Sequence, residues 1–174
     1  MIVRPILFAL LVASMPLAAS AAGRVLSTTG TLRAGDTTLK SGDELPNSEV
    51  RLASGTATLA IEGGRLLLTG PARFTPSKSS FRLDLGGLLS VLTQSAGRRF
   101  SVRTPAAVAA VRGTDFFVSV GTTQKVDICI CHGALKVSAK GMKTLSMAAE
   151  NHLNYRFWIV KSGTAHKKSP MIGH

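Results

Sequence analysis

The sequence predicts an all-β fold, and three observations support this prediction. From residue 24 onward, apolar and polar side chains alternate with a period of two in short stretches, as in strands that bury one face. Glycine and proline turn signals separate these stretches at short intervals. No stretch keeps the i, i+3, i+4 spacing of an amphipathic helix. Short strands joined by tight turns are therefore expected throughout.

The predicted strands follow one another along the chain. Gly63-Gly64 marks a turn between two of them, and we expect breaks at Gly70-Pro71, Gly86-Gly87, Thr104-Pro105 and His132-Gly133. Residues 106–111 are rich in alanine and could form a short helix, but Pro105 and Gly113 bracket them too tightly for more than two turns. The stretches predicted as strands are residues 49–52, 56–61, 65–68, 81–85, 99–103, 116–120, 125–130, 134–138 and 156–160.

The composition favours a thin core. Small aliphatic residues dominate and aromatic residues make up only 5% of the chain, whereas a wide barrel or sandwich needs larger side chains to fill it. We therefore expect an irregular two-layer β-solenoid, similar to a β-helix, over residues 24–160. The sequence contains no strict repeat, so its coils would be unequal.

The first 21 residues have the pattern of a secretory signal peptide. Arg4 precedes an apolar run over residues 5–17, and small residues follow up to Ala21 and Ala22. Cleavage after either alanine would export the rest of the chain, and we expect the bacterial periplasm as its location. The alternative is an uncleaved anchor, although the run is shorter than a membrane span requires. No later segment is apolar enough to cross a membrane.

The chain is strongly basic, with 21 Lys and Arg residues against 9 Asp and Glu residues, a formal charge of +12. The cations are spread over many strands and are not interleaved with aromatic residues, which argues against a nucleic-acid site. An acidic protein surface or the lipid phosphates of the envelope suit this charge better. Residues 161–174 are predicted to form a basic, flexible tail.

One turn motif follows from the chemistry of its residues. Thr104-Pro105 forces an extended approach, and Gly113 permits a positive-φ turn that a Cβ would obstruct. Arg112 and Asp115 flank this glycine and could pair across it, while the Thr114 hydroxyl can bond to nearby backbone. We interpret these six residues as a structural motif, because no nucleophile or base accompanies them.

A resemblance rests on the same residues. Residues 100–116 read FSVRTPAAVAAVRGTDF, which resembles the signature of FecR domains, and the similarity extends over residues 50–138. The resemblance implies a non-enzymatic role in cell-surface signalling, with a periplasmic domain that contacts an envelope protein. Family members also carry a cytoplasmic segment for a sigma factor, but only Met1 to Arg4 precede the apolar run here. We therefore expect an exported interaction or scaffold module.

The two cysteines offer a second hypothesis. Alternation along residues 126–133 places Cys129 and Cys131 on one face of a strand, at a spacing that would strain a disulfide. Together with His152 they could bind Cu or Zn, or respond to redox changes. Other candidate ligands are His132, His166, Met171 and His174. The alternative is that both cysteines are small core hydrophobes.

A conventional enzyme is not expected. The sequence has no glycine-rich phosphate loop, no nucleophile elbow and no HExxH motif. Two hypotheses therefore remain: a periplasmic FecR-type interaction module, and a metal-binding or redox-responsive protein that uses the Cys129–Cys131 pair.

Overall fold

The computed structural model describes residues 21–92, 100–111, 113–149, 156–161 and 164–168. Every regular element within these residues is a β-strand, which confirms the all-β prediction. The strands are β1 (Gly23–Thr28), β2 (Leu32–Ala34), β3 (Thr37–Leu39), β4 (Glu44–Leu45), β5 (Val50–Leu52), β6 (Thr56–Ile61), β7 (Gly64–Pro76), β8 (Ser80–Leu92), β9 (Phe100–Arg103), β10 (Val108–Val111), β11 (Asp115–Val120), β12 (Val126–Ser138), β13 (Leu145–Ala149), β14 (Arg156–Lys161) and β15 (Thr164–Lys168).

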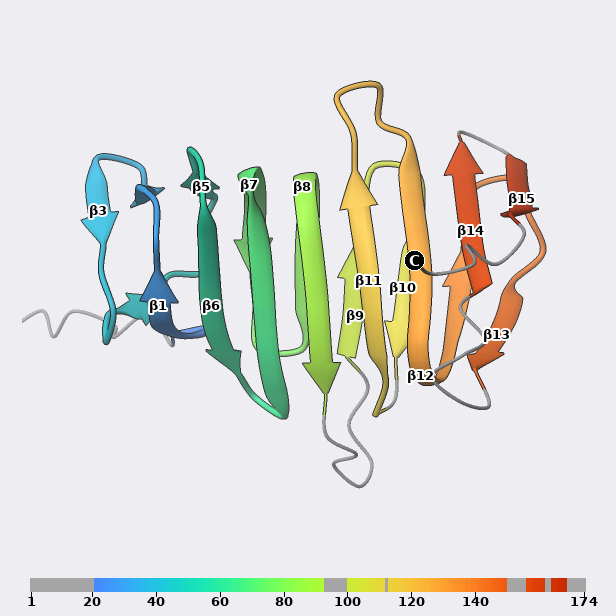
Figure 1. Cartoon of the computed structure of the whole chain (residues 1–174), viewed down its shortest axis with the longest axis horizontal. Coiled ribbons are helices and arrows are strands. Elements are labelled where there is room, and N and C mark those ends of the chain that lie inside the picture. Colours follow the sequence, from blue (N-terminus) through green and yellow to red (C-terminus); the bar gives the residue numbers. More distant parts are fainter. Residues whose placement is uncertain (1–20, 93–99, 112, 150–155, 162–163, 169–174) are drawn as a thin grey trace, which may run out of the picture.

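The strands lie in two layers (Figure 1). The front layer runs from β1 through β6, the first half of β7, the second half of β8, β11 and the first half of β12 to β14. The back layer runs from β2 through β5, the second half of β7, the first half of β8, β9, β10 and the second half of β12 to β13. We call these layers the front sheet and the back sheet.

Three long strands, β7, β8 and β12, each have 13 residues and contribute to both layers. Gly86, at φ 100°, marks the bend in β8; a Cβ built there would lie 2.6 Å from the Ala72 Cβ. The β7–β8 register breaks at the same level, between Thr69 and Arg73. In β12 the bend falls at Gly133, whose φ is 85°. Only glycine adopts this backbone and this close approach without strain.

These bends correct part of the sequence prediction. The signals at Gly70-Pro71, Gly86-Gly87 and His132-Gly133 were expected to end strands, but all three lie inside continuous strands. Gly86 and Gly133 bend their strands because a positive-φ residue within a ladder produces a bulge or kink, and the pairing resumes beyond it. The predicted option of a short helix at residues 106–111 is also wrong, since Val108–Val111 form β10 between β9 and β12.

The pairing closes a ring of five strands, in the order β8, β9, β10, β12, β11 and back to β8. Of the 15 described strand pairs, only β8–β9 is parallel. A solenoid stacks successive coils side by side, whereas here antiparallel neighbours and this ring dominate. The predicted β-solenoid is therefore not supported, although the two-layer arrangement is present.

The hydrophobic core fills the space between the two layers. The inward positions of the strands are almost fully buried, and the rings of Phe74 and Phe81 stack with their centroids 5.0 Å apart. Phe116 lies in the same core. Ser90 also occupies an inward position, although its side chain is polar. It is completely buried, and its Oγ has no hydrogen-bond partner among the described residues.

The first and the last described segments both pair with other parts of the chain. The Ala22 side chain is buried, and its backbone N–H donates to the Leu45 carbonyl over 2.9 Å. Residues 164–168, which fall in the predicted flexible tail, form β15 beside β14. Within the described residues, no helix is long and apolar enough to cross a membrane. The predicted signal peptide, residues 1–21, lies almost wholly outside the described part.

Candidate interaction surface

Five adjacent strands of the back sheet each present one exposed arginine. The sheet order β2, β5, β7, β8, β9 brings them side by side. In the register, Arg33 lies opposite Arg51, and Arg51 opposite Arg73. On the next two strands, one step further along, Arg82 lies opposite Arg103. We call this set, Arg33, Arg51, Arg73, Arg82 and Arg103, the arginine row.

Strand alternation explains why these side chains point outward. Arg51 stands between Val50 and Leu52, which are at most 1% exposed and face the core. The other members stand in the same way between inward-facing neighbours: Ala72 and Phe74 flank Arg73, and Phe81 and Leu83 flank Arg82. Because successive side chains on a strand face opposite sides, burial of these neighbours fixes the arginines on the outer face.

Nearby oxygens hold three of the guanidinium groups. The Arg51 Nε contacts Glu49 Oε1 at 2.7 Å, and the Arg82 Nε contacts Asp84 Oδ1 at 2.9 Å. The Arg33 Nη2 donates to the Asp36 carbonyl over 3.0 Å. Arg73 makes no ion pair with a described residue. The arginine of each pair is well exposed, at 70% and 64%, so we expect each pair to contribute about 0–1 kcal/mol. The pairs orient the arginines through Nε and leave the Nη groups of Arg51 and Arg82 available.

Four members of the row, all except Arg103, line a shallow groove made of three adjoining hollows, of about 550, 350 and 420 Å³. Arg33 and Arg51 line both the first and the second hollow, while Arg73 and Leu85 line both the second and the third. Apolar side chains complete the middle hollow: Leu52, Ala53, Pro71 and Ala72. We call this feature the arginine groove.

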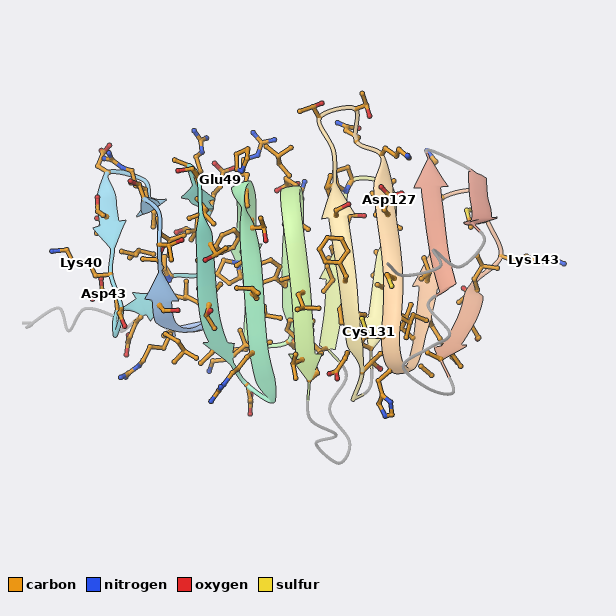
Figure 2. The ribbon with its side chains drawn as sticks, viewed as in Figure 1. Lys40, Asp43, Glu49, Asp127, Cys131 and Lys143 are labelled. Carbon is orange, nitrogen blue, oxygen red and sulfur yellow. The ribbon has the colours of Figure 1, made fainter. Side chains whose placement is uncertain are left out.

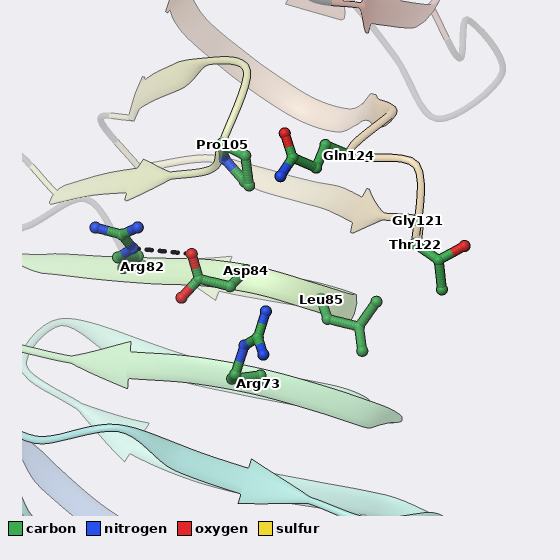
Figure 3. Close-up of a pocket in the computed structure, with 8 residues that line it drawn as sticks. All are labelled: Arg73, Arg82, Asp84, Leu85, Pro105, Gly121, Thr122 and Gln124. Atoms are coloured by element: carbon green, nitrogen blue, oxygen red, sulfur yellow. Dashed lines mark hydrogen bonds and ion pairs between the residues drawn. The ribbon is translucent and has the colours of Figure 1, made fainter.

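Two turns close the far end of the groove (Figure 3). Pro105 and Gln124 face Arg82, Asp84 and Leu85 across the third hollow. Thr104 holds the first turn, because its backbone N–H and its hydroxyl both bond to the Ala107 carbonyl, over 2.8 and 2.9 Å. The second turn is closed by Gly121 N–H to the Lys125 carbonyl at 2.9 Å.

Three further residues of the predicted turn motif, Gly113, Thr114 and Asp115, line none of the three hollows. Gly113 has the positive φ expected of it, 62°. Thr114 is 1% exposed, and its hydroxyl donates to the Ala134 carbonyl over 2.7 Å. Asp115 lies opposite His132 in the register. Arg112 is outside the described residues, so its pairing with Asp115 stays a prediction.

The predicted cysteine site has two neighbouring thiols. Cys129 is only 4% exposed, but it is not part of the hydrophobic core cluster. Its neighbours Ile128 and Ile130 face inward and belong to that cluster. Burial raises the pKa of the Cys129 thiol to about 12, assisted by its neighbour Cys131. Burial also raises the pKa of Cys131. Both are free thiols, and at neutral pH both are protonated, a form that binds soft metals poorly.

The other predicted metal ligands do not extend this site. His152, Met171 and His174 lie outside the described residues, as does the side chain of His166. His132 follows Cys131 directly and is exposed. Within the part of the chain that the structure describes, no three His, Cys, Asp or Glu side chains are grouped as a metal site would need. Binding of Cu or Zn therefore stays a prediction.

Cys129 belongs to a second feature, on the outer face of the front sheet. The register aligns Leu67, Leu89, Phe117 and Cys129 on four adjacent strands. Leu67 is 36% exposed, and Val91, two residues from Leu89 on the same face, is 49% exposed. The Phe117 ring covers Gly87, with its Cε2 3.4 Å from where a Cβ would lie. We call these four aligned residues the apolar row.

Sequence reasoning missed the arginine row. The cations were interpreted as scattered, because Arg33 and Arg103 are 70 positions apart in the sequence. Four of the five strands did carry a recognisable signal, an arginine between two apolar residues; Arg103 is the exception, since Thr104 follows it. The register between strands, which brings those positions together, has no comparable local signal.

Comparison with known proteins identifies the family. The family model described as "FecR protein" matches residues 44–136, more than half of the 174-residue chain. The chain therefore belongs to the FecR family, as the turn motif and its flanking strands predicted. The match spans the arginine groove apart from the residues contributed by β2 and its turns.

Solved structures support the fold. Two crystal structures of a protein from Parabacteroides distasonis ATCC 8503, described as a "putative anti-sigma factor", are similar to this chain with a TM-score of 0.60 and 14% sequence identity. The similarity covers 70% of this chain and 59% of that one, so this chain spans well under two thirds of its neighbour's length. At this identity the likeness concerns the fold alone. No curated protein matches the sequence.

Proposed function

We propose that this protein is a periplasmic, non-enzymatic module of envelope signalling that acts by binding another protein. Membership of the FecR family over residues 44–136 carries this proposal. The family is regulatory, and the solved neighbour, described as a "putative anti-sigma factor", has a similar fold. The arginine groove supplies an exposed, concave surface on which such binding can occur.

The proposed location depends on the leader. Residues 1–21 have the pattern of a signal peptide, and the described fold begins immediately after them, with Ala22 hydrogen-bonded to Leu45. Cleavage after Ala21 would keep this bond, whereas cleavage after Ala22 would remove it. We therefore favour Ala21 as the last residue of the leader.

No observation favours the metal-binding or redox alternative to the same degree. Its two cysteine ligands are protonated thiols, one of them buried. Deprotonation of both would have to accompany metal binding, which lowers the affinity near neutral pH.

Fractionation and crosslinking in the native bacterium test the proposal. We expect the protein in the periplasmic fraction with an N-terminus at Ala22, and a photo-crosslinker at Thr75, an outward position of β7 next to the groove, to capture an envelope protein in a band of defined size. A crosslinker at Thr58, on the front sheet, is the matched control. Retention of Met1 in the cytosol, or identical crosslinks from both positions, would contradict the proposal.

A further inference from the structure

We propose that the arginine groove binds an extended acidic segment of a partner protein, with carboxylates at alternate residues contacting the arginine row. This inference rests on the proposed function, because it names the chemistry of the partner that the module would bind.

The charge arrangement is the first reason. Arg33, Arg51 and Arg73 lie directly opposite one another on three paired strands, where like charges destabilise a sheet. An anion bound across the strands relieves this repulsion. Five arginines face three nearby acidic side chains, Asp36, Glu49 and Asp84, so the row retains positive charge for a ligand.

The guanidinium geometry is the second reason. Glu49 and Asp84 show that carboxylates bind at this row, in both cases on the Nε of an arginine. Each guanidinium has five N–H donors in a fixed fork. The pairs to Glu49 and Asp84 leave the Nη groups of Arg51 and Arg82, already oriented, for a second carboxylate. Bidentate pairs of this kind are the stronger form of the arginine–carboxylate contact.

The dimensions fit an extended peptide. The row crosses five adjacent strands, and four strand spacings amount to about 19 Å. An extended chain of about six residues covers that length, and its alternate side chains are spaced by roughly 6.5–7 Å on one side. Three carboxylates of such a peptide can therefore face the row at once. The hollows beneath, of about 350 to 550 Å³ each, give room for its backbone.

Two other anionic partners fit the groove less well. A membrane-binding face combines cations with apolar side chains that enter the lipid, but the exposed Leu26, Leu67 and Val91 belong to strands of the front sheet. Single-stranded nucleic acid needs aromatic platforms for base stacking, and none of the side chains that line the three described hollows is aromatic.

Fluorescence anisotropy with a labelled peptide of alternating Glu and Ser tests the inference on the full exported chain. We expect R51Q/R73Q to weaken binding by about tenfold or more, because it removes two charge-assisted contacts. The matched control R24Q/R65Q removes the same charge from exposed positions on the front sheet and should change the affinity by less than about twofold. The same peptide with Gln for Glu should not bind.

A conservative variant separates fork geometry from charge. R51K/R73K keeps both charges but loses bidentate contacts, and we expect it to bind more weakly than the wild type and more tightly than R51Q/R73Q. Melting curves for each variant check that the fold is intact.

Three results would overturn the inference: equal losses in R51Q/R73Q and R24Q/R65Q, no binding of the Glu–Ser peptide by the wild type, or binding to phosphatidylglycerol vesicles without binding to the peptide. None of them affects the crosslinking experiment at Thr75 and Thr58. Conversely, loss of the crosslink with retention of peptide binding would reject the proposed function and leave the groove's chemistry standing.

Discussion

The two outer faces of the molecule are built in the same way and differ in chemistry. On the front sheet, the register aligns Leu67, Leu89, Phe117 and Cys129. On the back sheet, it aligns Arg33, Arg51 and Arg73. Figure 2 labels Glu49, which lines the arginine groove, and Cys131, which lies two residues after Cys129 on β12.

The difference shows how a sheet sorts its composition. Alternation decides only which residues face outward; the register then decides which of them become neighbours. A chain with +12 formal charge therefore need not be uniformly basic on its surface. The back sheet carries one exposed arginine on each of five adjacent strands, and the apolar row carries none.

The largest expected effect comes from the bend that separates the two faces. Gly86→Ala places a Cβ 2.6 Å from the Ala72 Cβ and 2.8 Å from the Pro71 carbonyl oxygen, at a φ of 100°. We expect a loss of about 3 kcal/mol or more in the free energy of unfolding, measured by denaturant titration. Gly42→Ala is the matched control, because its φ is 93° and nothing lies within 4 Å of the added Cβ. Equal losses in both variants would show that the contact at the bend is unimportant.

The next effect concerns the apolar row and pH. The pKa of Cys129 is about 12 in the folded protein, against about 9 when exposed. Because the folded-state pKa is raised, this contribution to stability is complete below about pH 9 and is lost as the pH rises toward 12. We expect wild type to lose about 2 kcal/mol more than Cys129→Ala between pH 8 and pH 10.5, from denaturant titrations. Parallel pH profiles of the two proteins would mean that water reaches the thiol.

A smaller effect sharpens the electrostatic side of the comparison. At low salt, R51Q/R73Q should be more stable than the wild type by about 0.5–1 kcal/mol, because it removes like charges from paired positions. R24Q/R65Q should change stability less, since Ala60 lies between the two arginines in the register. The advantage of R51Q/R73Q should shrink in high salt, which screens exposed charges. A lower melting temperature for R51Q/R73Q at every salt concentration would contradict the predicted repulsion.

The smallest expected effect concerns the core between the two sheets. Ser90→Ala removes a fully buried hydroxyl that has no partner among the described residues, and we expect a gain of about 0.5–1 kcal/mol in thermal or denaturant unfolding. Peptide binding should be unchanged, because Ser90 faces the core. A loss of stability would indicate that the hydroxyl makes a contact in solution.

Local patterns in the sequence predicted local features well. The alternation around Arg51, Leu67 and Phe116 identified strands that the structure contains, and the residues around Gly113 identified the family. Features that depend on distant residues were missed. The glycines at 86 and 133 carry the same signal whether they end a strand or bend it, and only the pairing partners distinguish the two. The closed ring and the arginine row depend on the same long-range pairing.

The three bent strands place both faces on the same pieces of chain. On β7, Leu67 belongs to the apolar row and Arg73 to the arginine row; on β8, Leu89 and Arg82 divide in the same way. A one-residue insertion that shifts the register of either strand would reverse the orientation of its side chains. It would therefore disrupt the apolar row and the arginine row together. A substitution can change one of these surfaces alone, whereas an insertion or deletion inside β7 or β8 changes both surfaces.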